Sequence, residues 1–166
     1  MRLLSATLLV ALLGQHNALG APATQPRAPA TNSTSPDADA AILDALIPAF
    51  GVVTGAERDV LQIGSCSGFN GQTRVPIPCT CPPARDVFLK TLRDALIEGS
   101  ILDEPISFDL DLSDGSADTN RTRATASIIV LQNFSGVKGV GCPAASAPNL
   151  KFMQVTGARS DVLFVG

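Results

Sequence analysis

Residues 66–96 read CSGFNGQTRVPIPCTCPPARDVFLKTLRDAL and decide how the rest of the chain is interpreted. The stretch contains three of the four cysteines, a proline-rich connector and the clearest amphipathic helix pattern in the chain. Its apolar side chains recur at the spacing of a core-facing helix, with Gly99 as the expected C-cap. The sequence therefore predicts a helix that begins after Pro82-Pro83 and buries one stripe: Phe88, Leu89, Leu92, Ala95 and Leu96.

The connector ahead of this helix, residues 66–81, carries turn signals along its whole length. Asn70-Gly71 is a turn dipeptide, and Gly68, Pro76 and Pro78 interrupt the remainder. We expect an irregular loop here rather than a strand.

Outside this stretch the patterns predict two longer helices and several short pieces. Helices are expected over residues 36–47, with Pro36 in the first turn, and over residues 116–134, although the apolar run within the latter also suits a buried strand. A capping box predicts a short helix after Thr54. Residues 106–112 alternate like a short strand, or form an extended segment along the helices, and residues 149–155 suggest another extended piece.

These elements favour a mainly α fold, a small disulfide-stapled domain of three to four helices with a short extended segment, with α+β as the alternative. Residues 1–20 have the basic start, apolar run and small final residues of a secretory signal peptide. The Pro-, Ala-, Thr- and Ser-rich residues 21–35 predict a disordered arm. One helical domain is expected over residues 36–155 and a flexible tail over residues 156–166.

The composition excludes several kinds of chemistry. Removing residues 1–20 removes His16, the only histidine, so catalysis that depends on an imidazole and zinc sites with histidine ligands are excluded. The formal charge changes from −3 to −4 because Arg2 is lost, which argues against binding to nucleic acid. No later stretch is apolar enough to span a membrane. We expect no cofactor and no metal.

The four cysteines, Cys66, Cys79, Cys81 and Cys142, predict two disulfides in an exported chain. A bond between Cys79 and Cys81 would close a strained ring, so two connectivities stay open. They are Cys66–Cys79 with Cys81–Cys142, which we favour, and Cys66–Cys81 with Cys79–Cys142. A redox role for the CxC pair lacks any sequence signal of a low thiol pKa.

Carboxylates are the remaining catalytic candidates. Six of them cluster in residues 103–118, and a pair could serve a glycosidase, although the chain has no Trp or Tyr to form a sugar platform. The same segment superficially resembles a calcium loop, but Asp114 and Asn120 occupy the positions where an EF-hand needs Gly and Glu. The six are Asp103, Glu104, Asp109, Asp111, Asp114 and Asp118.

The connector also contains Thr73-Arg74-Val75 ahead of two prolines and a cysteine. This run resembles the reactive loop of Bowman–Birk-type serine-protease inhibitors, in which a basic residue enters the specificity pocket of the protease. Val75 replaces the usual serine and the prolines are shifted by one position. The resemblance implies an inhibitor that presents Arg74, whereas proline stiffening of a connector explains the same residues.

Three N-glycosylation acceptors occur, at Asn32, Asn120 and Asn133. Asn32 lies in the expected arm, Asn133 is expected opposite the apolar face of its helix, and Asn120 in line with that face.

Residues 75–96 and 124–148 together contain a CxC-Pro-Pro helix start, a long helix and a late Gly-Cys-Pro. This arrangement resembles small secreted fungal proteins with cysteines and no known activity. The resemblance implies secretion and brings no catalytic motif. We therefore expect a non-enzymatic, monomeric, glycosylated extracellular protein that interacts with another protein or a cell-wall component. The alternatives are an inhibitor using Arg74 and a carboxylate-based hydrolase.

Overall fold

The computed structural model describes residues 36–53 and 62–164, and these form an α+β domain. The expectation of a mainly α fold is therefore wrong, because two small antiparallel sheets accompany the four α-helices of the described ranges. The expected signal peptide, the arm and the short helix after Thr54 lie outside those ranges. The elements are α1 Pro36–Leu46, β1 Cys66–Asn70, β2 Thr73–Ile77, α2 Arg85–Glu98, β3 Ser100–Ile101, β4 Glu104–Pro105, α3 Ala117–Gln132, the 3-10 helix η1 Ala144–Ser146 and α4 Pro148–Thr156.

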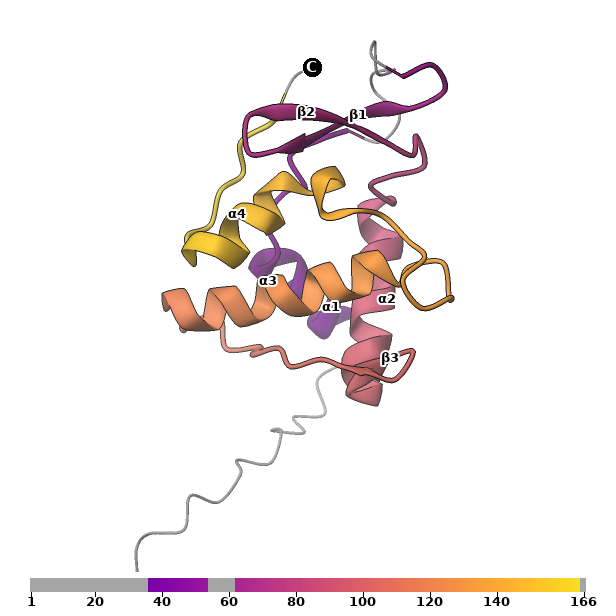
Figure 1. The fold of residues 1–166 in the computed structure, drawn as a ribbon. Helices are drawn as coiled ribbons and strands as arrows, with labels where there is room; N and C mark the ends of the chain where they lie inside the picture. The colour runs from indigo at the N-terminus through magenta and orange to yellow at the C-terminus, as the bar shows by residue number, and fades with distance from the viewer. Residues whose placement is uncertain (1–35, 54–61, 165–166) are drawn as a thin grey trace, which may run out of the picture. The chain divides into compact units, whose positions relative to one another are not determined.

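The connector predicted to be a loop is a β-hairpin. Asn70 pairs with Thr73 across a two-residue turn, and Gly71 takes the positive φ of 62° that the first position of such a turn requires. Counting from that pair, Pro76 falls at a position where the ladder needs no N–H donor, so the proline does not interrupt the pairing. The hairpin packs against η1 and α4 through the buried face of β1 (Figure 1).

Helix α2 confirms the predicted stripe and cap. Phe88 and Leu92 are fully buried, and Gly99 ends the helix in the left-handed conformation with φ 74°. The ring of Phe88 meets that of Phe50 edge-on at 5.1 Å. The core that α2 shares with the other helices contains Leu43, Ile47, Ala124, Leu131, Leu150 and Met153.

Residues 149–155 are helical, so the prediction of an extended piece there is wrong. Helix α4 begins with Pro148 in its first turn and ends at Gly157, whose φ is 74°. Leu150 and Met153 share its buried face, and α4 packs along α3 (Figure 1). A Cβ at Gly157 would lie 2.6 Å from Ala117, so glycine permits the close approach of these two helices.

Residues 106–111 have no regular secondary structure and belong to neither sheet. Ile106 and Phe108 pack against the core, whereas Leu110 and Leu112 are exposed. The alternative of an extended segment laid along the helices describes this stretch better than a strand.

The chain after α4 makes several specific contacts with α1 and β1. Asp161 Oδ1 accepts the Ala49 N–H at 2.7 Å, and the guanidinium of Arg159 donates to the carbonyls of Ala45 and Ile47. Phe164 donates its N–H to Gly51 O at 2.7 Å, and its ring lies 5.2 Å from that of Phe69. These contacts bring the described part of the predicted tail onto the domain.

The disulfides are Cys66–Cys79 and Cys81–Cys142, the favoured one of the two connectivities. The first closes the open end of the hairpin, and the second joins the start of α2 to the segment after α3. Across the described ranges, no helix has the length and hydropathy needed to cross a membrane.

Candidate interaction surface

The acidic segment is organised around one buried cation, the side chain of Arg123. This residue of α3 is 1% exposed, and its guanidinium donates to the carbonyl oxygens of Asp109, Asp111 and Asp114 at 2.8, 2.6 and 2.7 Å. Asn120 Oδ1 accepts a fourth, longer bond at 3.3 Å. The loop that resembles a calcium loop in sequence therefore directs its carbonyl oxygens at an arginine.

The carboxylates of the same segment serve as local caps. Asp111 Oδ1 accepts the N–H and hydroxyl of Ser113, and Asp114 accepts the Ser116 N–H and the Thr119 hydroxyl at the start of α3. These hydrogen bonds lower the pKa of Asp111 and of Asp114. A glycosidase acid requires the opposite direction. Within residues 36–53 and 62–164, no three acidic or cysteine side chains gather as a metal site would require.

Arg74 lies within β2, not at the tip of the hairpin. It pairs with Phe69 of β1 and is partly buried, with Thr73 and Val75 on either side in the same strand. The tip is instead Gly71-Gln72. The candidate inhibitor residues therefore do not form a protruding loop.

The two acceptor asparagines in the described chain both use their amides in the fold. Asn133 is 6% exposed; its Nδ2 donates to Ile129 O at 2.8 Å and its Oδ1 accepts the Gly139 N–H at 2.8 Å. Asn120 Nδ2 donates to Gly115 O and Gly157 O. Asn32 lies outside the described residues.

The bonds of Asn133 support an exposed loop that we name the tip loop, residues 135–141. Ser135 donates its N–H and hydroxyl to Val140 O, and Val140 donates its N–H to Val137 O at 2.9 Å, which closes a turn over Lys138 and Gly139. Gly139 has φ 73°, which suits the third position of a turn of this kind. The side chains of Val137 and Val140 are 58% and 53% exposed.

The base of the tip loop is fixed more firmly than its end. Cys142 donates its N–H to Leu131 O at 2.9 Å and is joined to Cys81. A Cβ at Gly141 would lie 2.5 Å from Leu131 O, so only glycine fits against the end of α3 at this point.

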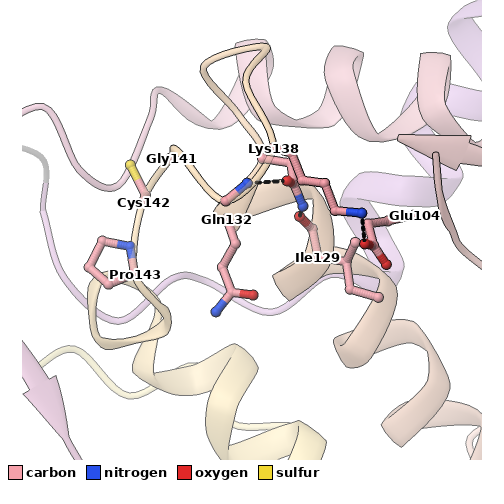
Figure 2. A pocket seen from close by; sticks show the side chains of 9 residues that line it. Glu104, Ile129, Gln132, Lys138, Gly141, Cys142 and Pro143 are labelled. Carbon is pink, nitrogen blue, oxygen red and sulfur yellow. Dashed lines mark hydrogen bonds and ion pairs between the residues drawn. The ribbon is translucent and has the colours of Figure 1, made fainter. Parts of the chain in front are cut away.

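A groove with a volume of about 550 Å³ is lined by the end of α3, the tip loop, Glu104 of β4 and the residues Cys142 and Pro143. Lys138 Nζ and Glu104 Oε1 form an ion pair at 2.5 Å across one end of it, and this contact raises the pKa of Lys138. Figure 2 shows the Gln132 side chain between Pro143 and Ile129. The groove thus combines apolar walls with an amide and a charge pair.

This surface was not predicted from the sequence, in which Cys142 was interpreted only as a disulfide partner and as part of the late Gly-Cys-Pro. The available signal was Val137-Lys138-Gly139-Val140, which places a turn-forming glycine between two valines. In comparisons with known proteins, no family model, curated protein or solved structure matches this chain.

Proposed function

We propose that the chain is exported, loses residues 1–20 and acts as a non-enzymatic extracellular protein that binds a partner through the tip loop. The observation that carries the proposal is the exposure of Val137 and Val140 on either side of Lys138, at the end of a loop whose base is covalently fixed. Exposed apolar side chains gathered at one site are typical of interaction surfaces. Because hydrogen bonds already define the shape of the loop, binding through it needs little further ordering.

Two disulfides support an oxidising compartment, in agreement with export. The partner that we propose is another extracellular protein or a cell-wall component, and the bound form contains a monomer of this chain. The resemblance to small secreted fungal proteins supports the same location and adds no activity.

The two alternative functions receive less support. Arg74 lies in a paired strand and is partly buried, which does not suit the convex loop of a protease inhibitor. The carboxylates of Asp109, Asp111 and Asp114 cap turns next to Arg123, and the pKa values of Asp111 and Asp114 are lowered, away from that of a general acid.

A binding comparison tests the proposal. Wild type, the double variant Val137→Ser/Val140→Ser and the control Val155→Ser are immobilised and exposed to extracellular fluid and to cell-wall material of the producing organism. Val155 of α4 is 64% exposed, so the control replaces a valine elsewhere whose exposure is comparable to that of Val137 and Val140. We expect wild type and Val155→Ser to retain the same component. The affinity of the double variant for it should be lower by about tenfold or more. Equal retention by all three proteins would contradict binding through the tip loop.

A further inference from the structure

Lys138 differs from the other basic residues of the described chain in its backbone setting. Arg159 lies in an irregular segment, but its guanidinium is bonded to α1 carbonyls and to Asp161. The remaining basic residues of residues 36–53 and 62–164 lie inside helices or in β2: Arg74, Arg85, Lys90, Arg93, Arg121, Arg123 and Lys151. Among the basic residues of these ranges, only Lys138 lies in an exposed turn and has a side chain whose one polar contact is a surface ion pair, with Glu104.

Opening the tip loop disrupts little of the fold. All seven residues from 135 to 141 are exposed, so no core contact is lost when the loop changes shape. The bonds that hold the loop are those between Ser135 and Val140, the turn bond from Val140 to Val137, and the bonds that Gly136 and Gly139 donate to Asn133. Segments with few buried contacts open at a small fraction of the global unfolding free energy. The loop should therefore reach an extended conformation far more often than the helices unfold.

We infer that the Lys138–Gly139 bond is a processing site for an extracellular protease of trypsin-like specificity. Such a protease has an acidic pocket that accepts the Lys138 side chain, and Gly139 has no side chain to obstruct the approach. One water is consumed: the C–N bond breaks, Lys138 gains a carboxylate and Gly139 gains an amino group. The proposed site requires only local opening of the turn and separation of the Lys138–Glu104 pair.

The product remains one particle. Cys142 lies on the new second chain and Cys81 on the first, so their disulfide joins the two. Packing of α3 on α4 also survives, since Leu131 and Leu150 stay buried and Asn120 Nδ2 still donates to Gly157 O at 3.0 Å. If the proposed function holds, the cut divides the binding loop, so proteolysis would end partner binding while the fold persists.

The test uses the full exported chain with its disulfides intact and a limiting amount of trypsin. We expect a cut after Lys138 about tenfold faster than after any other basic residue of the described ranges. The product should run as one band without reductant and as two with it, and the smaller chain should begin at Gly139. Cuts before residue 62 are identified by mass and set aside, because they concern another part of the chain.

Matched variants separate the possible results. Lys138→Gln should abolish the cut, Lys138→Arg should keep it, and Lys151→Gln, a change within α4, should leave its rate unchanged. Cleavage elsewhere in the described ranges at an equal rate, or none after Lys138 before global digestion, would overturn the processing site. Separation of the chains without reductant would overturn the linked product. If the cut occurs but the nicked protein binds its partner as wild type does, the processing site stands and the binding role of the tip loop fails.

Discussion

Arg123 is the residue on which the acidic segment depends. Its buried guanidinium donates to three backbone carbonyls of the segment, those of Asp109, Asp111 and Asp114. The arrangement resembles a small cation site in which the cation is covalently part of the helix. A buried charge is stable only when it is paired or bonded in this way.

Replacing Arg123 by Met should destabilise the protein by about 3–5 kcal/mol, because the segment loses the three hydrogen bonds that the guanidinium donates to its carbonyls. The matched control is Arg121→Met on the same helix, whose guanidinium pairs with the exposed Asp118 and should cost about 1 kcal/mol or less. Urea unfolding followed by far-ultraviolet circular dichroism measures both, since the chain has no Trp or Tyr to report by fluorescence. Equal stability of the two variants would contradict a structural role for Arg123.

The acceptor asparagines also yield a prediction at the scale of single residues. Glycan attachment uses the amide nitrogen, and the Nδ2 atoms of Asn120 and Asn133 both donate to backbone carbonyls in the folded chain. We expect the secreted, disulfide-bonded protein to carry N-glycan at Asn32 and to leave Asn120 and Asn133 unmodified. Peptide mapping before and after enzymatic removal of glycans checks this expectation. A glycan on Asn133 in the folded fraction would show that the loop base differs from the one described.

Among the elements, α2 was predicted from the sequence, whereas the hairpin and α4 were missed. The stripe of α2 has five apolar residues at helical spacing, and a glycine follows the helix. The sequence therefore indicates both the helical period and the end of the helix. The hairpin was missed because Asn70-Gly71 and the two prolines were treated as loop signals, although a glycine such as Gly71 also suits the first position of a two-residue hairpin turn. Helix α4 is short and mixed in composition, so its apolar pattern is weak. The better signals for a helix were the proline at its start, Pro148, and the glycine at its end, Gly157.

The tip loop could not be predicted for a different reason. Its exposure depends on Asn133, Gly141 and Cys142, which attach its base to the end of α3 and to Cys81. Of these contacts, the disulfide joins residues 61 apart in the sequence, so the local pattern alone does not reveal which side chains it leaves outside. The spacing of the four cysteines left two possible disulfide connectivities. The structure has the one with Cys81–Cys142, which fixes the base of the tip loop.

The packing of the hairpin on η1 gives a prediction at the scale of elements. A Cβ at Gly68 would lie 2.7 Å from Ala145 O and 2.6 Å from Ile77 Cγ2, so Gly68→Ala should force β1 away from η1. The expected loss of stability is about 1–3 kcal/mol. Gly115→Ala is the control, because nothing lies within 4 Å of its Cβ position, and it should change stability by about 0.5 kcal/mol or less. A thermal melt followed by circular dichroism compares them, and equal melting temperatures would argue against this contact.

For the whole molecule, the longer disulfide should contribute more stability than the shorter one. Cys81–Cys142 spans 61 residues and Cys66–Cys79 spans 13, so restriction of the unfolded chain predicts about 4 and about 3 kcal/mol respectively. The double variants Cys81→Ala/Cys142→Ala and Cys66→Ala/Cys79→Ala, unfolded in urea under the same conditions, measure the difference. A larger loss of stability on removal of Cys66–Cys79 would contradict this prediction.

At the scale of the whole molecule, the end of α1 is held by two segments that are far apart in the sequence. Arg85 of α2 and Arg159 after α4 both donate to carbonyls at the end of α1, and Asp161 accepts the Ala49 N–H. Cations suit the negative end of a helix, so these contacts hold α1 in place. The tip loop lies outside this network, which leaves it available to a partner without loss of the core.

Site-specific photocrosslinking tests the central claim, binding through the tip loop, most directly. A photoreactive phenylalanine analogue is placed at Val140 in one protein and at Val155 in another, and each is illuminated in extracellular fluid with cell-wall material present. We expect an adduct from position 140 and little adduct from position 155. Excess wild-type protein should suppress the adduct from position 140, whereas excess Val137→Ser/Val140→Ser variant should not. An adduct of equal yield from position 155, or none from position 140 while the protein still retains its partner, would contradict this claim.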